Sequence, residues 1–177
     1  MNIQSMSSGT FVQVLQMLSE ILDKGAAHAK AKGTDPNALL DLRLAPDMLP
    51  LSFQVRISCD HAKDAMARLT GQPLLQVENS EKTIADYKAR IERTIGYVKS
   101  VKAEAFEGAD NRPIEVPLMG DMVFATKGDE FLRDWVLPNF YFHVSTAYDI
   151  LRHNGVELGK RDLMSFAGNR IRPKVKV

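Results

Sequence analysis

The chain has 177 residues, of which 45% are hydrophobic and 25% charged, with 11 Gly and 8 Pro. This length and composition are typical of about one globular domain and exclude collagen-like, low-complexity and disordered chains. Lys and Arg total 23 against 22 Asp and Glu, a net charge of +1 that excludes a purely electrostatic partner such as nucleic acid or an acidic membrane surface.

Compartment and membrane partners follow from a few residues. Cys59 is the single cysteine, so neither an intramolecular disulfide nor a Cys/His zinc array is possible. No stretch approaches the ~20 apolar residues of a membrane span, and the amino terminus does not resemble a signal peptide. We therefore expect a soluble cytoplasmic protein without a membrane partner.

Two helices are predicted in the first half of the chain. Apolar residues recur at three- and four-residue spacing from Phe11 to Leu22, which predicts a helix over about 8–31. Asp35 and Pro36 indicate a short extra helix in the following connection. A second long helix begins after Asp47 and ends at Thr70, where Gly71 provides a stop signal.

The second half predicts two more helices with a hairpin between them. Ser80 is suited to cap a helix over about 80–103. Alternation between 112 and 126 predicts a short β-hairpin. Pro138 interrupts the last helical pattern, which predicts a short helix over about 129–136 and a long one over about 138–154.

Four long helices with one apolar face each bury those faces most simply against one another. We therefore expect an all-α protein: one four-helix-bundle domain over residues 1–177, with long inter-helix connections and the hairpin before the last long helix. A plain up-down bundle has short loops, so at least one long connection is expected to cross an end of the bundle.

The histidines divide into two groups. His61 and His143 lie on or beside the apolar stripes of two different helices, and histidines from facing helices are how bundles assemble metal sites. The alternative is that each ring only hydrogen-bonds a nearby polar group. His153 is suited to the end of its helix, and His28 to the surface.

Aromatic and polar residues on the last helix are candidates for a pocket. The run from Phe140 to Phe142 covers more helix surface than one core stripe needs, so one ring is available to line a pocket or a subunit interface. Tyr148 and Arg152 follow on the same helix as candidate pocket groups, although a solvated salt-bridging face is an alternative explanation for Arg152. No phosphate loop, nucleophile elbow or H-E-x-x-H motif occurs.

Two blocks of the chain resemble a known family. They are PNFYFHVSTAYDILRHNGV at 138–156, continuing to Gly159-Lys160, and the block from RLAPDM at 43–48 through FQV at 53–55 to CDHAK at 59–63. Both resemble an uncharacterised bacterial family within the DinB/YfiT-like superfamily of metalloenzymes. The resemblance covers nearly the whole chain and implies a four-helix bundle that is often a dimer.

The resemblance also implies a metal site. Metal-binding members use one His from the second helix and an H-x-x-x-H pair from the last, and His61 and His143 match the first two of these positions. The third falls on Ala147, which cannot ligate a metal such as zinc or nickel. Asp60, Asp64 and Tyr148 are candidates for a replacement oxygen ligand.

Two functions remain open at this stage. One is a bundle with an altered or vestigial metal site and a small-molecule pocket, for which the candidate residues are Asp60, Asp64, Phe140, Tyr148 and Arg152. The other is a divalent-metal-dependent transferase or hydrolase acting on a small molecule such as a thiol adduct. The sequence assigns no catalytic residue and does not decide whether the protein is an enzyme; the fold alone gives no substrate.

Overall fold

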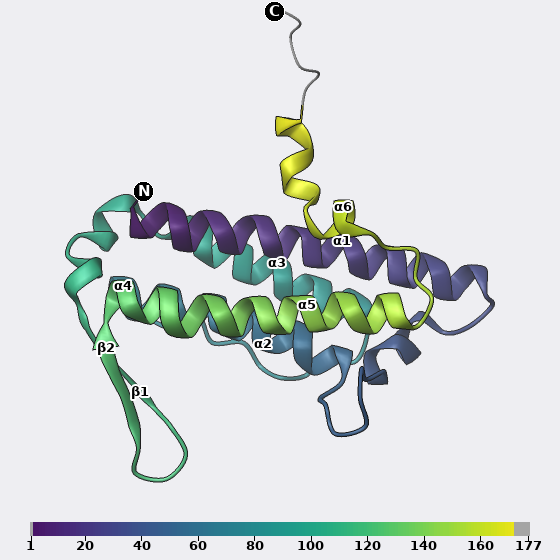
Figure 1. Ribbon diagram of the computed structural model, residues 1–177, viewed down its shortest axis with the longest axis horizontal. Helices are drawn as coiled ribbons and strands as arrows, with labels where there is room; N and C mark the ends of the chain where they lie inside the picture. Colours follow the sequence, from purple (N-terminus) through teal and green to yellow (C-terminus); the bar gives the residue numbers. More distant parts are fainter. Residues whose placement is uncertain (1, 172–177) are drawn as a thin grey trace, which may run out of the picture.

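The computed structural model describes residues 2–171, and four long helices dominate it (Figure 1). They are α1 (Thr10–Ala31), α2 (Leu51–Thr70), α3 (Ile84–Ser100) and α5 (Leu137–His153). Helix α2 packs against α3 and α5, and α1 packs against the same two helices. The expected all-α four-helix bundle is confirmed.

The core lies between these helices and is built from the predicted apolar stripes. Phe11 and Leu18 of α1, Val55 and Met66 of α2 and Phe140 of α5 are all fully buried. A fully buried side chain of this size contributes about 1.5–3 kcal/mol relative to an exposed one, so the stripes are the main source of bundle stability. His61 and His143 lie at the border of this core on two helices that pack together.

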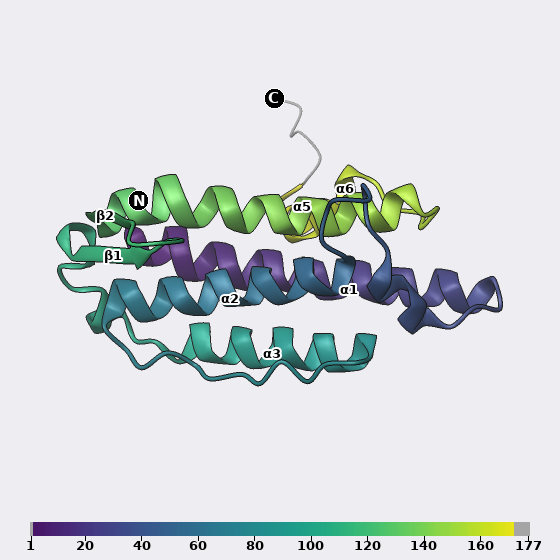
Figure 2. The same ribbon diagram turned by 90° about the horizontal axis from the view of Figure 1, so that it is seen from below.

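The long connection that runs along the bundle is residues 71–83, which lie beside α3 in Figure 2. The predicted start of α3 at Ser80 was wrong, because Thr83 is the capping residue. Its side chain accepts from the Asp86 amide at 3.1 Å, and Asp86 accepts from the Thr83 amide at 2.9 Å. This reciprocal capping box satisfies two amides and fixes the start of the helix at Ile84. Residues 71–83 are therefore an extended connection along the bundle and not part of the helix.

The predicted division of the last helical pattern near Pro138 is confirmed, although the two parts are contiguous. A short α4 (Gly128–Glu130), a π-helical segment (Phe131–Val136) and α5 follow one another without a gap. Pro138 lies in the first turn of α5, where a missing amide proton is tolerated. Asn139 donates from its side chain to the Trp135 carbonyl at 2.7 Å, which provides that carbonyl with a partner in the widened turn.

The first helical pattern begins before the predicted residue 8. A π-helical turn (Ser5–Gly9) leads directly into α1, and Ser7 donates to the Ile3 carbonyl at 2.7 Å instead of capping the helix. The remaining short helices are 3-10 segments at Pro36–Asp41, Ala103–Phe106, Ala109–Asn111 and Ser165–Arg170, and the four-residue α6 (Lys160–Leu163). The predicted short helix after Asp35 is confirmed, with Asp35 as its cap.

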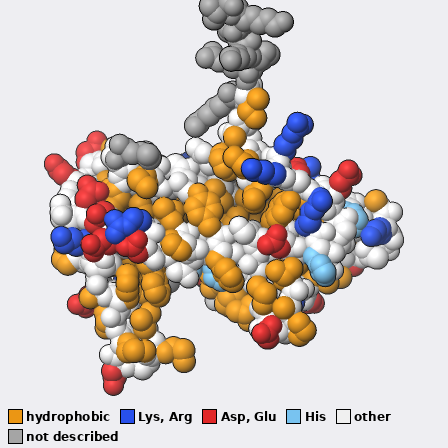
Figure 3. Space-filling model, viewed as in Figure 1, with side chains coloured by type: hydrophobic (Ala, Val, Ile, Leu, Met, Phe, Trp, Pro, Cys, Tyr) orange, Lys and Arg blue, Asp and Glu red, His pale blue; other side chains and the backbone are white. Residues whose placement is uncertain are grey.

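The predicted hairpin is confirmed as β1 (Pro113–Pro117) and β2 (Val123–Lys127), paired antiparallel. It projects from one end of the bundle, and many of its exposed side chains are hydrophobic (Figure 3). Phe124 stacks on Trp135 with ring centroids 5.0 Å apart, which ties the hairpin to the segment before α5. Within residues 2–171, no helix has the length and apolar character needed to span a bilayer.

Candidate functional site

His61 of α2 and His143 of α5 lie together at the surface between these two helices. Their ring centroids are 5.6 Å apart and their planes differ by 26°, a stacked arrangement. Both side chains are partly buried. Helical spacing alone predicted that each ring borders the core; the packing of α2 against α5 is what brings the two rings face to face.

The pKa values of both imidazoles are lowered, which favours their neutral forms. Burial, with a smaller contribution from the neighbouring His61 ring, lowers the pKa of His143 to about 4. Burial also lowers the pKa of His61, although the carboxylates of Asp64 and Asp60 oppose that shift. A neutral imidazole retains one nitrogen lone pair, so the pair can bind a cation or accept a hydrogen bond.

Gln54 holds His143 from the core side of α2. Its Oε1 lies 2.7 Å from His143 Nδ1, and its Nε2 donates to the Leu49 carbonyl at 2.8 Å. Sequence reasoning missed this residue. The available signal was the spacing of Gln54, Ser58 and His61, which places three polar residues on one face of a helix that otherwise buries apolar side chains.

Two phenyl rings border the pair on its solvent side. The ring centroid of His143 lies 6.4 Å from that of Phe53 and 5.2 Å from that of Phe142, and both pairs are edge-to-face. Phe142 is 56% exposed. The guanidinium of Arg56 lies 5.1 Å from the centroid of the Phe53 ring, within cation–π distance. The surroundings of His143 are therefore aromatic, with the Arg56 cation beyond Phe53, whereas His61 has the carboxylates of Asp60 and Asp64 nearby.

The position of the missing third ligand is inside the core. Ala147 lies one turn after His143 and its side chain is 0% exposed. Among residues 2–171, no cluster of three or more His, Cys, Asp or Glu side chains is arranged to hold a metal ion. The two imidazoles thus fall one ligand short of the three protein ligands that zinc sites ordinarily require.

The two candidate replacement carboxylates have partners of their own. Asp60 accepts from Arg90 at 2.8 Å and lies 3.3 Å from Lys63. Asp64 accepts from Arg68 at 2.8 Å. Since each carboxylate is engaged by a cation, moving either one to a metal would break an ion pair within the chain.

The remaining predicted pocket residues make contacts elsewhere in the bundle. Phe140 is fully buried and packs edge-to-face on Phe11 with ring centroids 5.1 Å apart, so it is a core residue. Tyr148 is partly buried and packs against the core cluster. Arg152 donates to the Leu158 carbonyl and so helps to hold the segment after α5. Cys59 is fully buried, and burial raises the pKa of its thiol to about 12, which disfavours a nucleophilic role.

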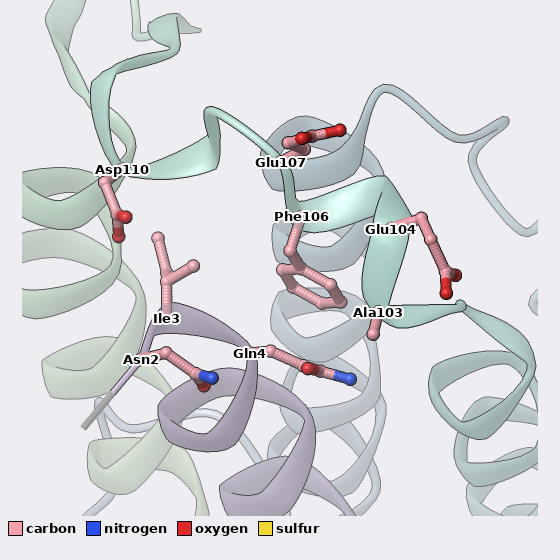
Figure 4. Close-up of a pocket in the computed structure, with 8 residues that line it drawn as sticks. All are labelled: Asn2, Ile3, Gln4, Ala103, Glu104, Phe106, Glu107 and Asp110. Atoms are coloured by element: carbon pink, nitrogen blue, oxygen red, sulfur yellow. The ribbon is translucent and has the colours of Figure 1, made fainter.

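A cavity of about 410 Å³ lies elsewhere, at the end of the bundle where the chain begins. Asn2, Gln4, Glu104, Glu107 and Asp110 are among its lining residues (Figure 4). Figure 4 shows the three carboxylates pointing in different directions, so they do not converge on one point. Titratable side chains therefore meet more closely at the His61–His143 pair than in this cavity.

Comparison with known proteins agrees with the fold. The structure resembles the crystal structure of a DinB family member protein from Shewanella denitrificans with a TM-score of 0.85 and 38% sequence identity, covering 92% of this chain and 91% of that one. The class of protein is thus a DinB-like helical bundle. No curated protein matches the chain.

Residues 4–164 match a family described as Domain of unknown function (DUF1993). The chain belongs to this family. Its assignment to a DinB-like family of unknown function confirms the resemblance drawn from the two sequence blocks.

Proposed function

We propose that this protein is a small-ligand-binding bundle with an altered metal site, in which His61 and His143 are the ligand-contacting groups. The observation that carries the proposal is the pair itself: two neutral imidazoles stacked 5.6 Å apart, beside a fully buried Ala147 where a third imidazole would stand. Titratable groups with lowered pKa values that meet at a partly exposed position are candidates for a functional site, which favours a binding role for the pair.

The surroundings of the pair suit a small ligand with an apolar part. Phe53 and Phe142 flank His143 and supply aromatic surface. In the single chain the Phe142 ring is exposed to solvent, so a ligand can reach it. The imidazoles supply the polar contact. A site of this kind, mostly apolar with a few convergent polar groups, is the usual form of a small-molecule site.

A second candidate is a divalent-metal-dependent transferase or hydrolase acting on a small, thiol-linked substrate. Its support is the survival of both imidazoles at facing positions and the similarity to a DinB family member. When bound, a divalent ion would polarise a substrate group or lower the pKa of a bound water or thiol. Because residues 2–171 hold no cluster of three such ligands around the pair, this candidate requires either a rearranged side chain of the protein or a ligand supplied by the substrate or water.

Metal analysis separates the two candidates. Protein purified without a histidine tag is incubated with zinc, nickel and manganese, desalted and analysed for bound metal. The altered-site proposal predicts no stoichiometric metal, because removing one of three imidazoles costs several kcal/mol of metal affinity. One bound metal per chain that is lost in both His61→Ala and His143→Ala would favour the metal-dependent enzyme.

We also propose a homodimer. Tyr141 and Phe142 expose aromatic surface on α5, and the hairpin exposes Met119 and Met122 at its turn. A stable dimer requires at least ~1,000 Å² of buried surface in total. These four side chains would supply part of that area, and their neighbours on α5 and the hairpin would supply the rest. Sedimentation at micromolar concentration should give a species near twice the 19.8 kDa chain mass, and a species near 19.8 kDa would contradict the dimer.

A further inference from the structure

A chain of three hydrogen-bonding groups leads from the backbone of the 42–50 connection to the histidine pair. The Leu49 carbonyl accepts from Gln54 Nε2 at 2.8 Å, and Gln54 Oε1 lies 2.7 Å from His143 Nδ1. Gln54 is only 2% exposed, so water does not compete for its amide. The order of donors and acceptors along this chain is set by its first member.

A backbone carbonyl can only accept, so the Gln54 amide must turn its NH₂ group toward Leu49. The amide oxygen then faces His143, and an oxygen cannot donate. The proton of this last hydrogen bond must therefore be on His143 Nδ1. The tautomer follows from the network in the same way that amide orientations are assigned.

We propose that Gln54 is a positioning residue that holds His143 in its Nδ1–H form and thereby makes Nε2 the ligand-binding atom of the site. This inference rests on the proposed function for the statement that His143 contacts the ligand. With Nδ1 protonated and the ring neutral, the lone pair lies on Nε2. His143 then selects electron-pair acceptors, either a metal cation or a ligand carrying an N–H or O–H donor, over carboxylates and phosphates.

The arrangement also fixes the orientation of the ring. Phe53 and Phe142 contact His143 edge-to-face and restrict it by packing, whereas Gln54 adds the one directional contact at a nitrogen atom. Base and ligand imidazoles in other sites depend on such a partner for their tautomer, and its loss typically lowers metal affinity 10–100-fold. A purely space-filling role for Gln54 would leave the tautomer of His143 unaffected.

The test is nitrogen NMR of the imidazole rings at pH 7 in the full chain labelled with ¹⁵N. The wild type should show His143 with a protonated Nδ1 and an unprotonated Nε2. Gln54→Met keeps the length of the side chain without the amide and should shift the ring to a mixture of both tautomers. Gln54→Glu keeps an oxygen acceptor opposite Nδ1 and should retain the Nδ1–H form.

Ser58→Ala is the matched control, because Ser58 is also buried on α2 and its hydroxyl donates to the backbone carbonyl of Gln54, not to the side-chain amide that faces His143. It should leave the His143 tautomer unchanged. An Nε2–H form in the wild type, or an unchanged tautomer in Gln54→Met, would overturn the inference. If Gln54→Met does not fold, the wild type and Gln54→Glu still decide it, and a ring with Nε2 protonated and Nδ1 unprotonated in either would overturn it. These spectra need no ligand, so a failure of the proposed function in the metal analysis is separately visible.

Discussion

Asp60 and His61 are neighbours on α2, yet they belong to two polar clusters of opposite character. Asp60 faces Arg90, which is 1% exposed and also bonds Glu81 at 2.8 Å. His61 faces His143 across the α2–α5 contact. The first cluster pairs opposite charges within the chain, and the second brings together two neutral groups that each keep a free lone pair. The chemistry of the two clusters thus separates a structural role for Asp60 from the binding role that we propose for His61 on the same helix.

The largest expected effect is on the charged cluster. Arg90→Met removes the cation from Glu81 and Asp60 and leaves a buried carboxylate without its partner. Breaking a buried pair in this way costs about 3–5 kcal/mol, to be measured by urea unfolding. Arg133→Met, which removes an exposed pair with Asp134, is the control and should cost less than about 1 kcal/mol. Equal losses in the two variants would contradict the structural role of Arg90.

The histidine pair should make stability depend on pH. The folded-state pKa of both rings lies below the unfolded value, so the unfolded chain binds more protons as pH falls below about 6.5. Stability is therefore fully present above that pH and declines toward pH 4. Allowing for partial exposure of the rings, the loss is on the order of 1–2 kcal/mol.

Unfolding measured between pH 7 and pH 4 checks this expectation. Hydrogen-bond partners also lower the pKa of three carboxyl groups, those of Asp86, Asp134 and Asp162. The stabilisation of the folded protein by these groups is likewise lost as pH falls through their folded-state pKa values. His143→Phe isolates the contribution of the pair and should flatten the profile between pH 6.5 and 4. A profile as steep as that of the wild type would show that the pair is not its source.

The smallest effect concerns the surface of the site. Phe142→Ser removes a ring that is 56% exposed. The free energy of unfolding of the protein should therefore change by no more than about 0.5 kcal/mol. If Phe142 lies in the proposed dimer interface, sedimentation should shift toward the monomer in the same variant. A stability loss above about 2 kcal/mol would mean that this ring supports the bundle and is not free for binding.

Much of the fold was predictable because it depends on local patterns. Apolar spacing gave four long helices, Asp35 gave the short capped helix and alternation gave the hairpin. The start of α3 was missed because Ser80 and Glu81 also resemble a helix start, whereas the box at Thr83 uses Asp86 in place of the usual Glu or Gln. The division near Pro138 was predicted, but the π-helical form of the segment before it was not, because apolar spacing does not distinguish a π-helical turn from an α-helical one.

The candidate site was less predictable because it depends on contacts between helices. Helix periodicity gives the face on which His61 and His143 each lie. It does not show that the two rings meet; that expectation came from the family resemblance, and the 5.6 Å between the ring centroids came from the structure. The engagement of Asp60 by Arg90 depends on the position of α3, thirty residues further along the chain. Gln54 was missed because its spacing with Ser58 and His61 shows a shared helix face but not the contact with His143 on another helix.

The central claim is that the His61–His143 pair is a site that has lost one ligand at Ala147, and Ala147→His tests it most directly. The variant recreates an i, i+4 imidazole pair on α5. Because Ala147 is fully buried, the metal-free variant should be destabilised by ~1–3 kcal/mol. Ala147→Leu overpacks the same position without supplying a ligand and is the matched control.

Zinc and nickel titration calorimetry of the three proteins is the deciding measurement. Ala147→His should bind in the micromolar range or tighter, about −8 kcal/mol, and metal at a hundredfold excess over Kd should restore about 2.7 kcal/mol of stability. The wild type and Ala147→Leu should show no such binding. No gain in affinity for Ala147→His over Ala147→Leu would contradict the account, because the pair would then not have the geometry of a metal site.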